Sequence, residues 1–487
     1  MIWLDQLHAT QPVAQAIGIL ALVCVAGMSL GSIKVRGIEL GTAGVLFAGI
    51  ITGYFTRPVD HATLAFVKEF GLILFVFTIG LQLGPGFFAA LRRDGLRLNA
   101  LVVGVVLFGS ALAVMIGWLL RIDPAAVLGV LSGASTSTTS LGAAQQALST
   151  QTSVSEQQQA LVALAYAVTY PAAIAGIIGT LLLLKRLFRI DTRKEVEMLT
   201  AERQRHIEPL EPHRTVAVGN VNLATLTQRG IVVTHRNVLG KTIEELGMDT
   251  QWGVVVRRVT RGDIPLTPGS DFRVKFGDVV QAVGDEQSLE RAEELLGNST
   301  KELDETHFIP LFLGIALGII AGTIPIAIPG LPHPVQLGLA GGPLVIALLL
   351  GRIGHVGRLV FYVPINANLA FREFGIALFF AAVGLTAGPS FFTSVFSGAG
   401  LLWLVTGLVV TVLPLLLFGF AARVMLHMNF AVLGGLLAGS VTDPPALAFI
   451  NNLTKSDAPT LAYVTVYPLT TVLRVLAAQV LAFTLVS

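Results

Sequence analysis

The feature that most constrains the fold of this chain is a duplication of its apolar segments. Residues 69–88, EFGLILFVFTIGLQLGPGFF, align without a gap to residues 373–392, EFGIALFFAAVGLTAGPSFF. Residues 164–171, LAYAVTYP, recur at 461–468 as LAYVTVYP. Each half of the chain holds the same six apolar segments in the same order, so the fold is expected to consist of two copies of one structural unit.

These segments have the length and composition of membrane spans. About 20 consecutive apolar residues cross the roughly 30 Å hydrocarbon core of a bilayer, and the chain has many such runs, with a mean hydropathy of +0.75. We therefore expect an integral membrane protein. The first run, residues 12–32, has spanning length and no basic residue before it, so a cleaved secretory signal is not expected. The single cysteine, Cys24, lies in this run and is expected to pack as a small apolar side chain.

The charged residues are concentrated in the middle of the chain. Of the 62 Asp, Glu, Lys and Arg residues, 38 lie between residues 185 and 305. The histidines of this region are not spaced as metal ligands, so neither a metal nor a cofactor is expected. The sequence predicts two membrane repeats around a soluble insert, divided as first repeat 1–189, linker 190–213, insert domain 214–297, linker 298–306 and second repeat 307–487.

Positive charge is unevenly distributed over the loops of the first repeat. Lys34 and Arg36 follow the first segment and three arginines at 92, 93 and 97 follow the third, whereas the opposite side has only Arg57 and Arg121. Because positive residues stay cytoplasmic, segments one to four cross in alternate directions, starting from outside. The sixth segment must end inside, at the charged insert, so the fifth begins and ends outside. We expect this fifth segment to be a re-entrant hairpin.

The second repeat gives the same arrangement upside down. Its segments alternate with returns at Arg352, Arg358 and Arg423, so its hairpin enters from the cytoplasmic face. Five crossings per repeat is an odd number, which makes the repeats inverted, as in many secondary transporters. The predicted fold is an α-helical membrane protein of two inverted repeats, each with five transmembrane helices and one re-entrant hairpin, and with a small α/β cytoplasmic domain inserted between them. Both chain termini are expected on the periplasmic or extracellular side.

The two hairpins carry the strongest candidate site. AVLGVLSGASTSTTSLGAAQQ at 126–146 matches AVLGGLLAGSVTDPPALAFINN at 431–452 after a one-residue gap. Backbone that turns inside a membrane needs polar partners, and each turn places the N-terminus of a half-helix near the midplane, where a carboxylate is favoured. Asp443 is expected to be an N-cap, with Pro444 at the first helical position. The candidate substrate-binding residues of the hairpins are Ser135, Thr136, Ser137, Thr138, Thr139, Ser140, Ser440, Thr442, Asp443 and Pro444; the alternative is that they only satisfy bent backbone.

Arg474 is the other candidate, because it lies in the middle of the last apolar segment, where a charge is costly. Its guanidinium is expected to bind a substrate carboxylate through two hydrogen bonds, and the alternative is a structural pair with Asp443. The charges at 68–69 and 372–373 are expected to be helix-end groups that extend toward lipid headgroups. Tyr170 and Tyr467, beside prolines, are expected either to mark helix breaks near the site or to anchor the protein at the membrane interface.

The insert has the pattern of a small α/β domain. Short β-rich runs, GIVVTH, GVVVRRVTRG and DFRVKFGDVVQAVG, precede an amphipathic helix, DEQSLERAEELLG. With the preceding NVLGKTIEEL, this order resembles the C-terminal module of potassium-transport regulators (TrkA-C, also called RCK-C) over about 80 residues. That resemblance implies dimerisation or the sensing of a small ligand. The nucleotide-binding half that usually precedes the module is absent.

The duplicated membrane unit, with SGASTSTTSLGAAQQ and AGSVTDPPALAFINN on either side of such a module, resembles the aspartate:alanine exchanger family of bacteria. The resemblance covers nearly the whole chain. It departs from the family's usual hairpin motif at Thr139 or Ser140, where Pro is usual, and at Ala448, where Gly is usual. It implies exchange of amino acids or dicarboxylates, such as L-aspartate for L-alanine, by a homodimer in the bacterial inner membrane.

Two rivals come from other classes of protein. A sodium- or proton-coupled dicarboxylate symporter or exporter would share the fold and use Asp443 for the cation. A potassium channel is disfavoured because no TVGYG filter is present. An enzyme is not expected, since no nucleophile–base pair appears. The expected partners are small anionic amino-acid or dicarboxylate substrates, membrane lipid, a second copy of the chain and a small-molecule regulator on the insert; nucleic acid is not expected.

Overall fold

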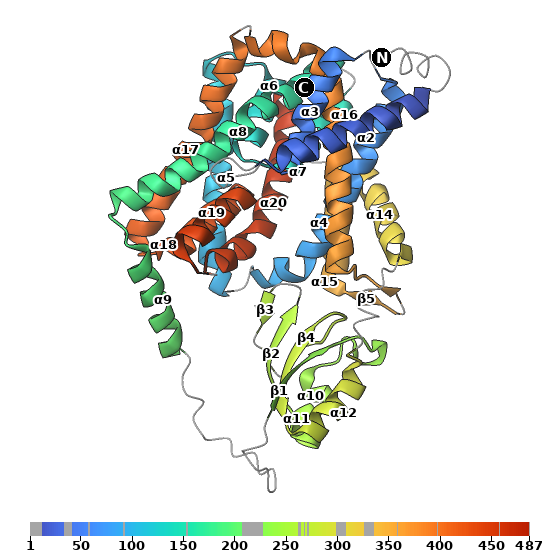
Figure 1. The fold of residues 1–487 in the computed structure, drawn as a ribbon, viewed down its shortest axis with the longest axis vertical. Coiled ribbons are helices and arrows are strands. Elements are labelled where there is room, and N and C mark those ends of the chain that lie inside the picture. Colours follow the sequence, from blue (N-terminus) through green and yellow to red (C-terminus); the bar gives the residue numbers. More distant parts are fainter. Residues whose placement is uncertain are drawn as a thin grey trace.

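The computed structural model contains two helical halves and a small α/β domain that lies below them in the view of Figure 1. The C-terminal end of the last helix lies at the end of the molecule away from this domain (Figure 1). The residues that the structure describes are 12–33, 41–56, 59–90, 93–151, 154–206, 227–261, 264–266, 268–269, 272–298, 308–325, 336–357, 359–396, 398–456 and 458–486.

The helices occur in the same order in both halves. Those of the first half are α2 Pro12–Gly31, α3 Ala43–Phe55, α4 His61–Ala90, α5 Arg93–Leu119, α6 Pro124–Ala134, α7 Thr138–Ser149 and α8 Glu156–Leu187. Those of the second half are α14 Phe308–Thr323, α15 Gly338–Ile353, α16 Ile365–Phe396, α17 Ala399–Met425, α18 Phe430–Ser440, α19 Pro444–Thr454 and α20 Ala458–Leu485. The predicted division of each half into six apolar segments, the fifth of which is split, matches this order.

Seven helices of the described residues are long and apolar enough to cross a membrane: α2, α4, α5, α8, α16, α17 and α20. Helices α3, α14 and α15 are apolar but shorter, so the count of ten crossings stays a prediction. Several of the loop charges used to orient the segments, such as Lys34, Arg36 and Arg358, lie outside the described residues.

Reciprocal glycine contacts relate the two halves. A Cβ atom on Gly71 would lie 2.7 Å from the carbonyl oxygen of Gly375, and a Cβ atom on Gly375 would lie 2.7 Å from that of Gly71. Further along, Asn368 Nδ2 donates to the carbonyl oxygen of Thr78 at 3.2 Å. As α4 advances from residue 71 to 78, its contacts on α16 therefore recede from 375 to 368. The equivalent helices α4 and α16 pack antiparallel, with contacts of the kind that a two-fold axis generates.

Two further helix pairs, α3 with α16 and α15 with α4, are equivalent to each other under the same two-fold relation. Helix α3 packs on α16 through Gly49 and Gly53, and α15 packs on α4 against Gly80 and Gly84. In each case the approach of backbone to backbone leaves no room for a side chain. The packing of small residues at the same positions in both halves explains why the glycines of residues 69–88 and 373–392 recur in register.

The insert contains a four-stranded antiparallel sheet in the order β1-β4-β2-β3. The strands are β1 Thr227–Val232, β2 Val255–Arg261, β3 Ile264–Leu266 and β4 Val279–Gly284, and the connecting helices are η2 Arg236–Val238, α10 Ile243–Leu246, α11 Met248–Trp252 and α12 Glu286–Leu296. Buried side chains of α12, including Leu289, Ala292 and Leu296, pack on β1 and β4. The predicted strands and final helix are confirmed, whereas the predicted start of the insert at residue 214 lies outside the described residues.

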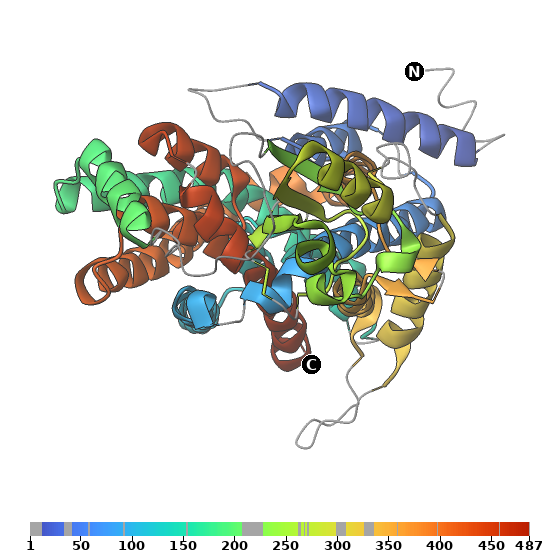
Figure 2. The same cartoon turned by 90° about the horizontal axis from the view of Figure 1, so that it is seen from below.

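The insert is held against the second half by a short ribbon, β5 His355–Val356 and β6 Leu359–Val360, between α15 and α16. Val360 is 2% exposed and belongs to the insert's own hydrophobic core, and the rings of Phe276 and Tyr362 lie 5.1 Å apart. Figure 2, a view from below, shows the insert in front of the helices. The domain therefore covers one face of the helical part.

Helix α9, Thr192–His206, follows the first half and contacts the second. Buried Glu195 pairs with Arg423 at 2.6 Å and accepts a hydrogen bond from the backbone N–H of Phe430 at 2.9 Å. The carboxylate thus satisfies an N–H group at the start of α18. The segment predicted as a linker, 190–213, is therefore helical over Thr192–His206 and contacts the base of the second hairpin.

Candidate functional site

Both split segments are broken helices whose breaks meet in the interior. We define the first tip as residues 135–137, between α6 and α7, and the second tip as residues 441–443, between α18 and α19. Thr136 has φ +48° and Thr442 has φ +55°. This left-handed conformation is unfavourable for a β-branched residue and marks stored strain of about 1–3 kcal/mol at each tip.

The two tips are hydrogen-bonded to each other. Thr136 Oγ1 donates to the carbonyl oxygen of Val441 at 2.6 Å, and Thr442 Oγ1 donates to that of Ser135 at 3.4 Å. Each threonine therefore bonds to the residue that precedes its own counterpart. This reciprocity brings the N-termini of α7 and α19 together at the centre of the helical part.

The two hairpins correspond residue by residue, without the gap that the sequence alignment contained. Asp123 and Asn429 are the N-caps of α6 and α18, and each side chain accepts a hydrogen bond from the second residue of its helix. Both first arms are 11 residues long, so Thr136 corresponds to Thr442 with no gap anywhere. The one-residue gap of the sequence alignment is therefore wrong: the matching AVLG letters are displaced by one position in the structure.

The hydroxyl groups of the first tip are mostly satisfied within the hairpin. Ser135 Oγ donates to the carbonyl oxygen of Leu131 at 2.8 Å, Ser137 Oγ and Thr139 Oγ1 lie 3.1 Å apart, and Ser140 Oγ lies 2.9 Å from Ser132 Oγ. Half-buried Thr138 lies 3.4 Å from the phenol of Tyr166. Ser137 caps α7 by accepting from the N–H of Ser140. The predicted cluster is therefore assembled, and much of it supports the bent backbone.

Asp443 differs from the rest of the two tips. It occupies the N-cap position of α19, as predicted, but makes no side-chain cap hydrogen bond. Pro444 and Pro445 follow it and have no N–H to donate. The side chain is 0% exposed, and neither carboxylate oxygen forms a hydrogen bond of ordinary geometry among the described residues, although the backbone N–H of Ala446 lies close to it. A buried carboxylate without such a hydrogen bond is costly, so this position needs a proton, a cation or a cationic ligand.

Arg474 lies beside the second tip. Its Nε and Nη2 atoms donate to the carbonyl oxygen of Ser440 at 3.1 and 2.6 Å. A guanidinium at the C-terminus of α18 interacts favourably with the helix dipole. Among the described residues Arg474 forms no ion pair with Asp443, so the predicted structural pair is wrong. The side chain is nevertheless buried at the tip, next to Ser135 and Val441.

Two cavities lie on opposite sides of the tips. The insert-side cavity, about 310 Å³, is bounded by α4, α16, α19, α20 and the insert. The first-half cavity, about 210 Å³, is bounded by α4, α7, α8 and α16. In the alignment of residues 69–88 with 373–392, extended by one turn, their linings correspond as Lys68 with Arg372, Leu64 with Asn368, Ile79 with Val383, Gln82 with Thr386 and Leu83 with Ala387.

The two cavities reach to different depths. The insert-side cavity is lined by Pro444, the first residue of α19, and by Tyr463 and Tyr467. The first-half cavity contacts α7 only at Gln145 and Ser149, about two helical turns from Thr138. Tyr166 of α8 and Leu141 of α7, which do not line this cavity, are fully buried. The insert-side cavity therefore reaches the first residue of α19, beside the second tip, whereas the first-half cavity ends about two turns from the start of α7.

Several sequence-based expectations change in this light. Lys68 and Arg372 line the cavities, which the sequence did not predict, and their extension toward headgroups stays a prediction. Helices α8 and α20 continue through Pro171 and Pro468, so these residues mark no helix break. Tyr166, which contacts Thr138 at the start of α7, was missed, although LAYAVTYP and LAYVTVYP place it in register with Tyr463.

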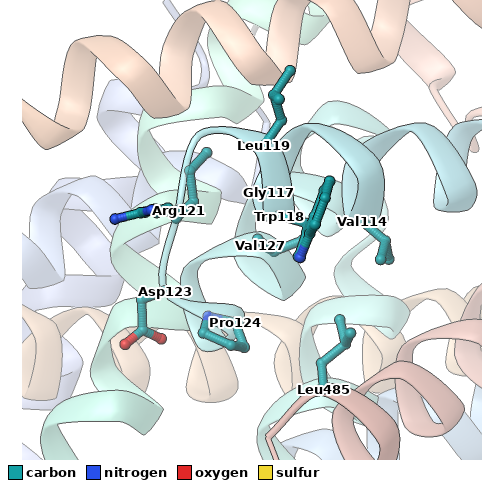
Figure 3. Close-up of a pocket in the computed structure, with 10 residues that line it drawn as sticks. Val114, Gly117, Trp118, Leu119, Arg121, Asp123, Pro124, Val127 and Leu485 are labelled. Carbon is teal, nitrogen blue, oxygen red and sulfur yellow. The ribbon is translucent and has the colours of Figure 1, made fainter.

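A larger cavity of about 730 Å³ lies elsewhere, where α5 ends and α6 begins. Figure 3 shows Val114, Trp118 and Leu485 on one side of it and Arg121 and Asp123 on the other. Trp118 is 81% exposed, and Asp123 lies at the opposite end of α6 from the first tip. This cavity is therefore a surface feature away from the tips.

Comparison with known proteins agrees with this arrangement. Residues 19–186 and 310–483 match the aspartate–alanine exchanger profile, described as a predicted permease membrane region, and residues 230–297 match the TrkA-C domain. A presumed transport protein of Pasteurella multocida is 40% identical over 97% of this chain and 99% of its own length. An uncharacterized transporter of Bacteroides fragilis is 40% identical over 97% of each chain. No solved structure matches.

Proposed function

The chain belongs to the aspartate–alanine exchanger family of membrane permeases, with an inserted TrkA-C domain, and from this premise we propose that it is a secondary transporter that exchanges anionic amino acids or dicarboxylates. The pair that we favour is L-aspartate for L-alanine. The observation that carries the proposal is the pair of equivalent cavities, of which one reaches Pro444 beside the second tip and the other contacts α7 only at Gln145 and Ser149. Such a pair is what alternating access requires.

The membrane arrangement that we propose is two inverted repeats in the bacterial inner membrane, each with five crossings and one re-entrant hairpin. The antiparallel packing of α4 on α16 supports it. A two-fold axis between antiparallel equivalent helices is perpendicular to those helices, and therefore lies in the plane of the membrane that they cross. The insert is then cytoplasmic, and the C-terminus, at the far end of the molecule (Figure 1), is periplasmic.

The substrate site that we propose is formed by the two tips. The N-termini of α7 and α19 favour a carboxylate, and the buried carboxylate of Asp443 forms no hydrogen bond of ordinary geometry among the described residues. An amino acid supplies both charges, since its carboxylate suits the helix ends and its ammonium suits Asp443. Hydroxyl groups from residues 135–140, Ser440 and Thr442 then orient the solute. In this arrangement Arg474 binds the substrate only after it leaves Ser440.

Transport in this scheme consists of closing the insert-side cavity and opening the first-half cavity around the tips. The reciprocal hydrogen bonds of Thr136 and Thr442 are kept at the centre in both states. The side chains around Tyr166 open to admit the solute while those around Tyr463 close. The strained φ values at the tips fit a segment that moves. A homodimer, and a small-molecule regulator bound to the TrkA-C domain, remain part of the proposal by analogy with the family.

Counterflow in proteoliposomes tests the exchange. Vesicles loaded with unlabelled L-alanine or L-aspartate should accumulate radiolabelled L-aspartate, whereas empty vesicles should not. Succinate has the two carboxylates of aspartate without its ammonium and is the matched comparison. Accumulation that is equal in loaded and empty vesicles would contradict exchange, and preference for succinate would contradict the role given to Asp443.

The absence of an ordinary hydrogen bond to Asp443 among the described residues also favours a second function, a sodium- or proton-coupled dicarboxylate symporter, because the position would suit a coupling cation. The exchanger and the symporter are distinguished by the gradient that drives uptake. Uptake into empty vesicles that follows an imposed sodium or proton gradient, and that stops when the gradient is collapsed, would identify the symporter.

A further inference from the structure

The insert forms part of the wall of the insert-side cavity. Arg261 at the end of β2 and residues 275–278 before β4 face Arg372 of α16 and Tyr463 of α20 across this cavity. A solute that approaches the second tip from this side passes the insert first. No residue of the insert was among the predicted substrate contacts.

The segment that carries Lys275 is fixed to the helical part. Lys275 Nζ donates to the main-chain carbonyl of Arg352 at the end of α15, and the side chain lies beside Gly354. Two residues on, Gly277 has φ +80°, and a Cβ atom there would lie 2.6 Å from the ring of Tyr362. The close approach of backbone to ring holds the loop at the cavity mouth, so Lys275 has a defined position.

The cavity wall carries an excess of positive charge. Arg261 is paired with Asp278 through two hydrogen bonds of 2.7 and 2.6 Å, and these two charges offset one another. Lys275 and Arg372 form no ion pair with any carboxylate among the described residues. Two cations without counter-charge on a concave, partly buried surface raise the local concentration of anions.

The first-half cavity has the opposite balance. Lys68 there is accompanied by Glu69, by Glu156 and by His61, whose Nε2 lies 3.4 Å from Glu156 Oε1, so the carboxylates outnumber the lysine. Because of the duplication, each cavity has one cation at an equivalent position, Lys68 or Arg372. The insert contributes a second cation, Lys275, to the insert-side cavity only. Lys275 therefore supplies the additional positive charge on the insert side, and Glu69 and Glu156 supply the negative charge on the other side.

We propose that Lys275 of the insert, together with Arg372, forms an anion-binding vestibule that holds an acidic solute before it reaches the tips, and only on the insert side. This rests on the function proposed above. The volume of about 310 Å³ is enough for a small amino acid or dicarboxylate, and the cavity is continuous with Pro444. The insert is in this scheme a part of the transport pathway, and it makes the apparent affinity for acidic solutes higher on its own side.

The test compares the two sides of the membrane. Everted and right-side-out membrane vesicles, preloaded with L-alanine, take up radiolabelled L-aspartate from the insert side and the opposite side respectively. Lys275→Gln should raise the KM for L-aspartate about five- to tenfold in everted vesicles, and less as the salt concentration rises. The KM in right-side-out vesicles should stay within twofold, and Lys275→Arg should restore the everted value.

Arg291→Gln is the matched control, because it removes one positive charge from an exposed position on α12 of the same domain and does not line the cavity. It should leave both KM values unchanged. An equal rise of KM on both sides, or no rise in everted vesicles, would overturn the vestibule.

A second measurement separates failure of the vestibule from failure of the proposed exchange. Calorimetric titration of the purified full-length protein with L-aspartate reports binding without turnover. Weaker binding by Lys275→Gln than by wild type and Arg291→Gln supports the vestibule even if no exchange is seen. Absence of L-aspartate binding to the wild type, or binding that Lys275→Gln does not change, counts against it.

Discussion

The first and second tips have the same backbone conformation but carry different side chains. Both break their helices at a threonine of positive φ, and each threonine bonds to the other tip. At the next position the first tip has Ser137, which caps α7, whereas the second has Asp443, which caps nothing. Duplication has thus kept the geometry that two crossing hairpins need, and a carboxylate is present at the second tip only.

The largest effect is expected from removing the charge that distinguishes the tips. Asp443→Asn keeps the shape of the side chain and should lower kcat/KM for L-aspartate exchange on the order of a hundredfold, because a buried charge pair with the substrate ammonium is lost. Counterflow in proteoliposomes measures this. Succinate should lose its disadvantage in the same variant.

Ser137→Ala is the corresponding change at the first tip. It removes the cap bond to Ser140 and should cost about 0.5–2 kcal/mol of stability, with exchange altered only a few-fold. If Ser137→Ala and Asp443→Asn impair exchange to the same degree, the two tips are functionally alike and the distinction drawn between them is wrong.

A second comparison concerns the packing that the tips share. Gly129 and Gly435 contact the backbone carbonyls of Val162 and Pro459 so closely that neither position has room for a Cβ atom. Gly129→Ala and Gly435→Ala should each destabilise the protein by about 1–3 kcal/mol or more, through forced helix separation. Thermal unfolding in detergent measures this loss.

Gly179 on α8 provides the control, because nothing lies within 4 Å of the position that its Cβ would take. Gly179→Ala should be neutral or stabilising, since alanine restricts the unfolded chain. A large loss at Gly129 with none at Gly435 would show that the two hairpins are packed differently, despite their common geometry.

The hydrogen bonds between the tips are expected to matter less, and unequally. Thr136→Val removes a donor 2.6 Å from the carbonyl of Val441, and Thr442→Val removes one 3.4 Å from that of Ser135. The first change should cost about 1–2 kcal/mol, since it leaves a buried carbonyl unpaired, and the second should cost less than half of that. Equal losses of melting temperature would mean that the two bonds have equal strength.

Much of this arrangement could be predicted from the sequence, because membrane folds obey few rules. The apolar repeats and the distribution of positive charge over the loops predicted both hairpins, and the positions of Asp443 and Pro444 at the start of α19 followed from capping preferences. Backbone N–H and C=O groups in a membrane need hydrogen-bond partners, so a polar run between two apolar runs is compatible with few structures.

The partners of individual side chains could not be predicted in the same way. Arg474 was expected to face a substrate or Asp443, and it bonds to the carbonyl of Ser440, a contact that depends on where one hairpin ends beside another helix. Lys68 and Arg372 read as helix-end charges because the sequence does not show that α4 and α16 cross beside the cavities. The contact between the insert and the insert-side cavity depends on how the insert docks against the helices, which no local sequence pattern shows.

The smallest expected effect concerns pH and the two cavities. Burial and the nearby charges of Arg261 and Arg352 lower the pKa of Lys275 to about 8, with Asp278 opposing the shift. The ammonium is charged below this value and loses its charge as the pH rises through it. The titratable and charged groups around it are Asp278, Arg261, Arg352, Arg372, His355 and Tyr362.

Between pH 7 and pH 9, with equal pH on both sides, the KM for L-aspartate in everted vesicles should therefore rise roughly two- to fivefold. The first-half cavity lacks Lys275 and has Lys68 and His61 instead, so the pH dependence of KM in right-side-out vesicles should be the same in Lys275→Arg as in wild type. Lys275→Arg should abolish the rise in everted vesicles, since a guanidinium keeps its charge over this range. A rise that persists in Lys275→Arg would belong to another group, and the difference between the cavities would then not reside in the insert.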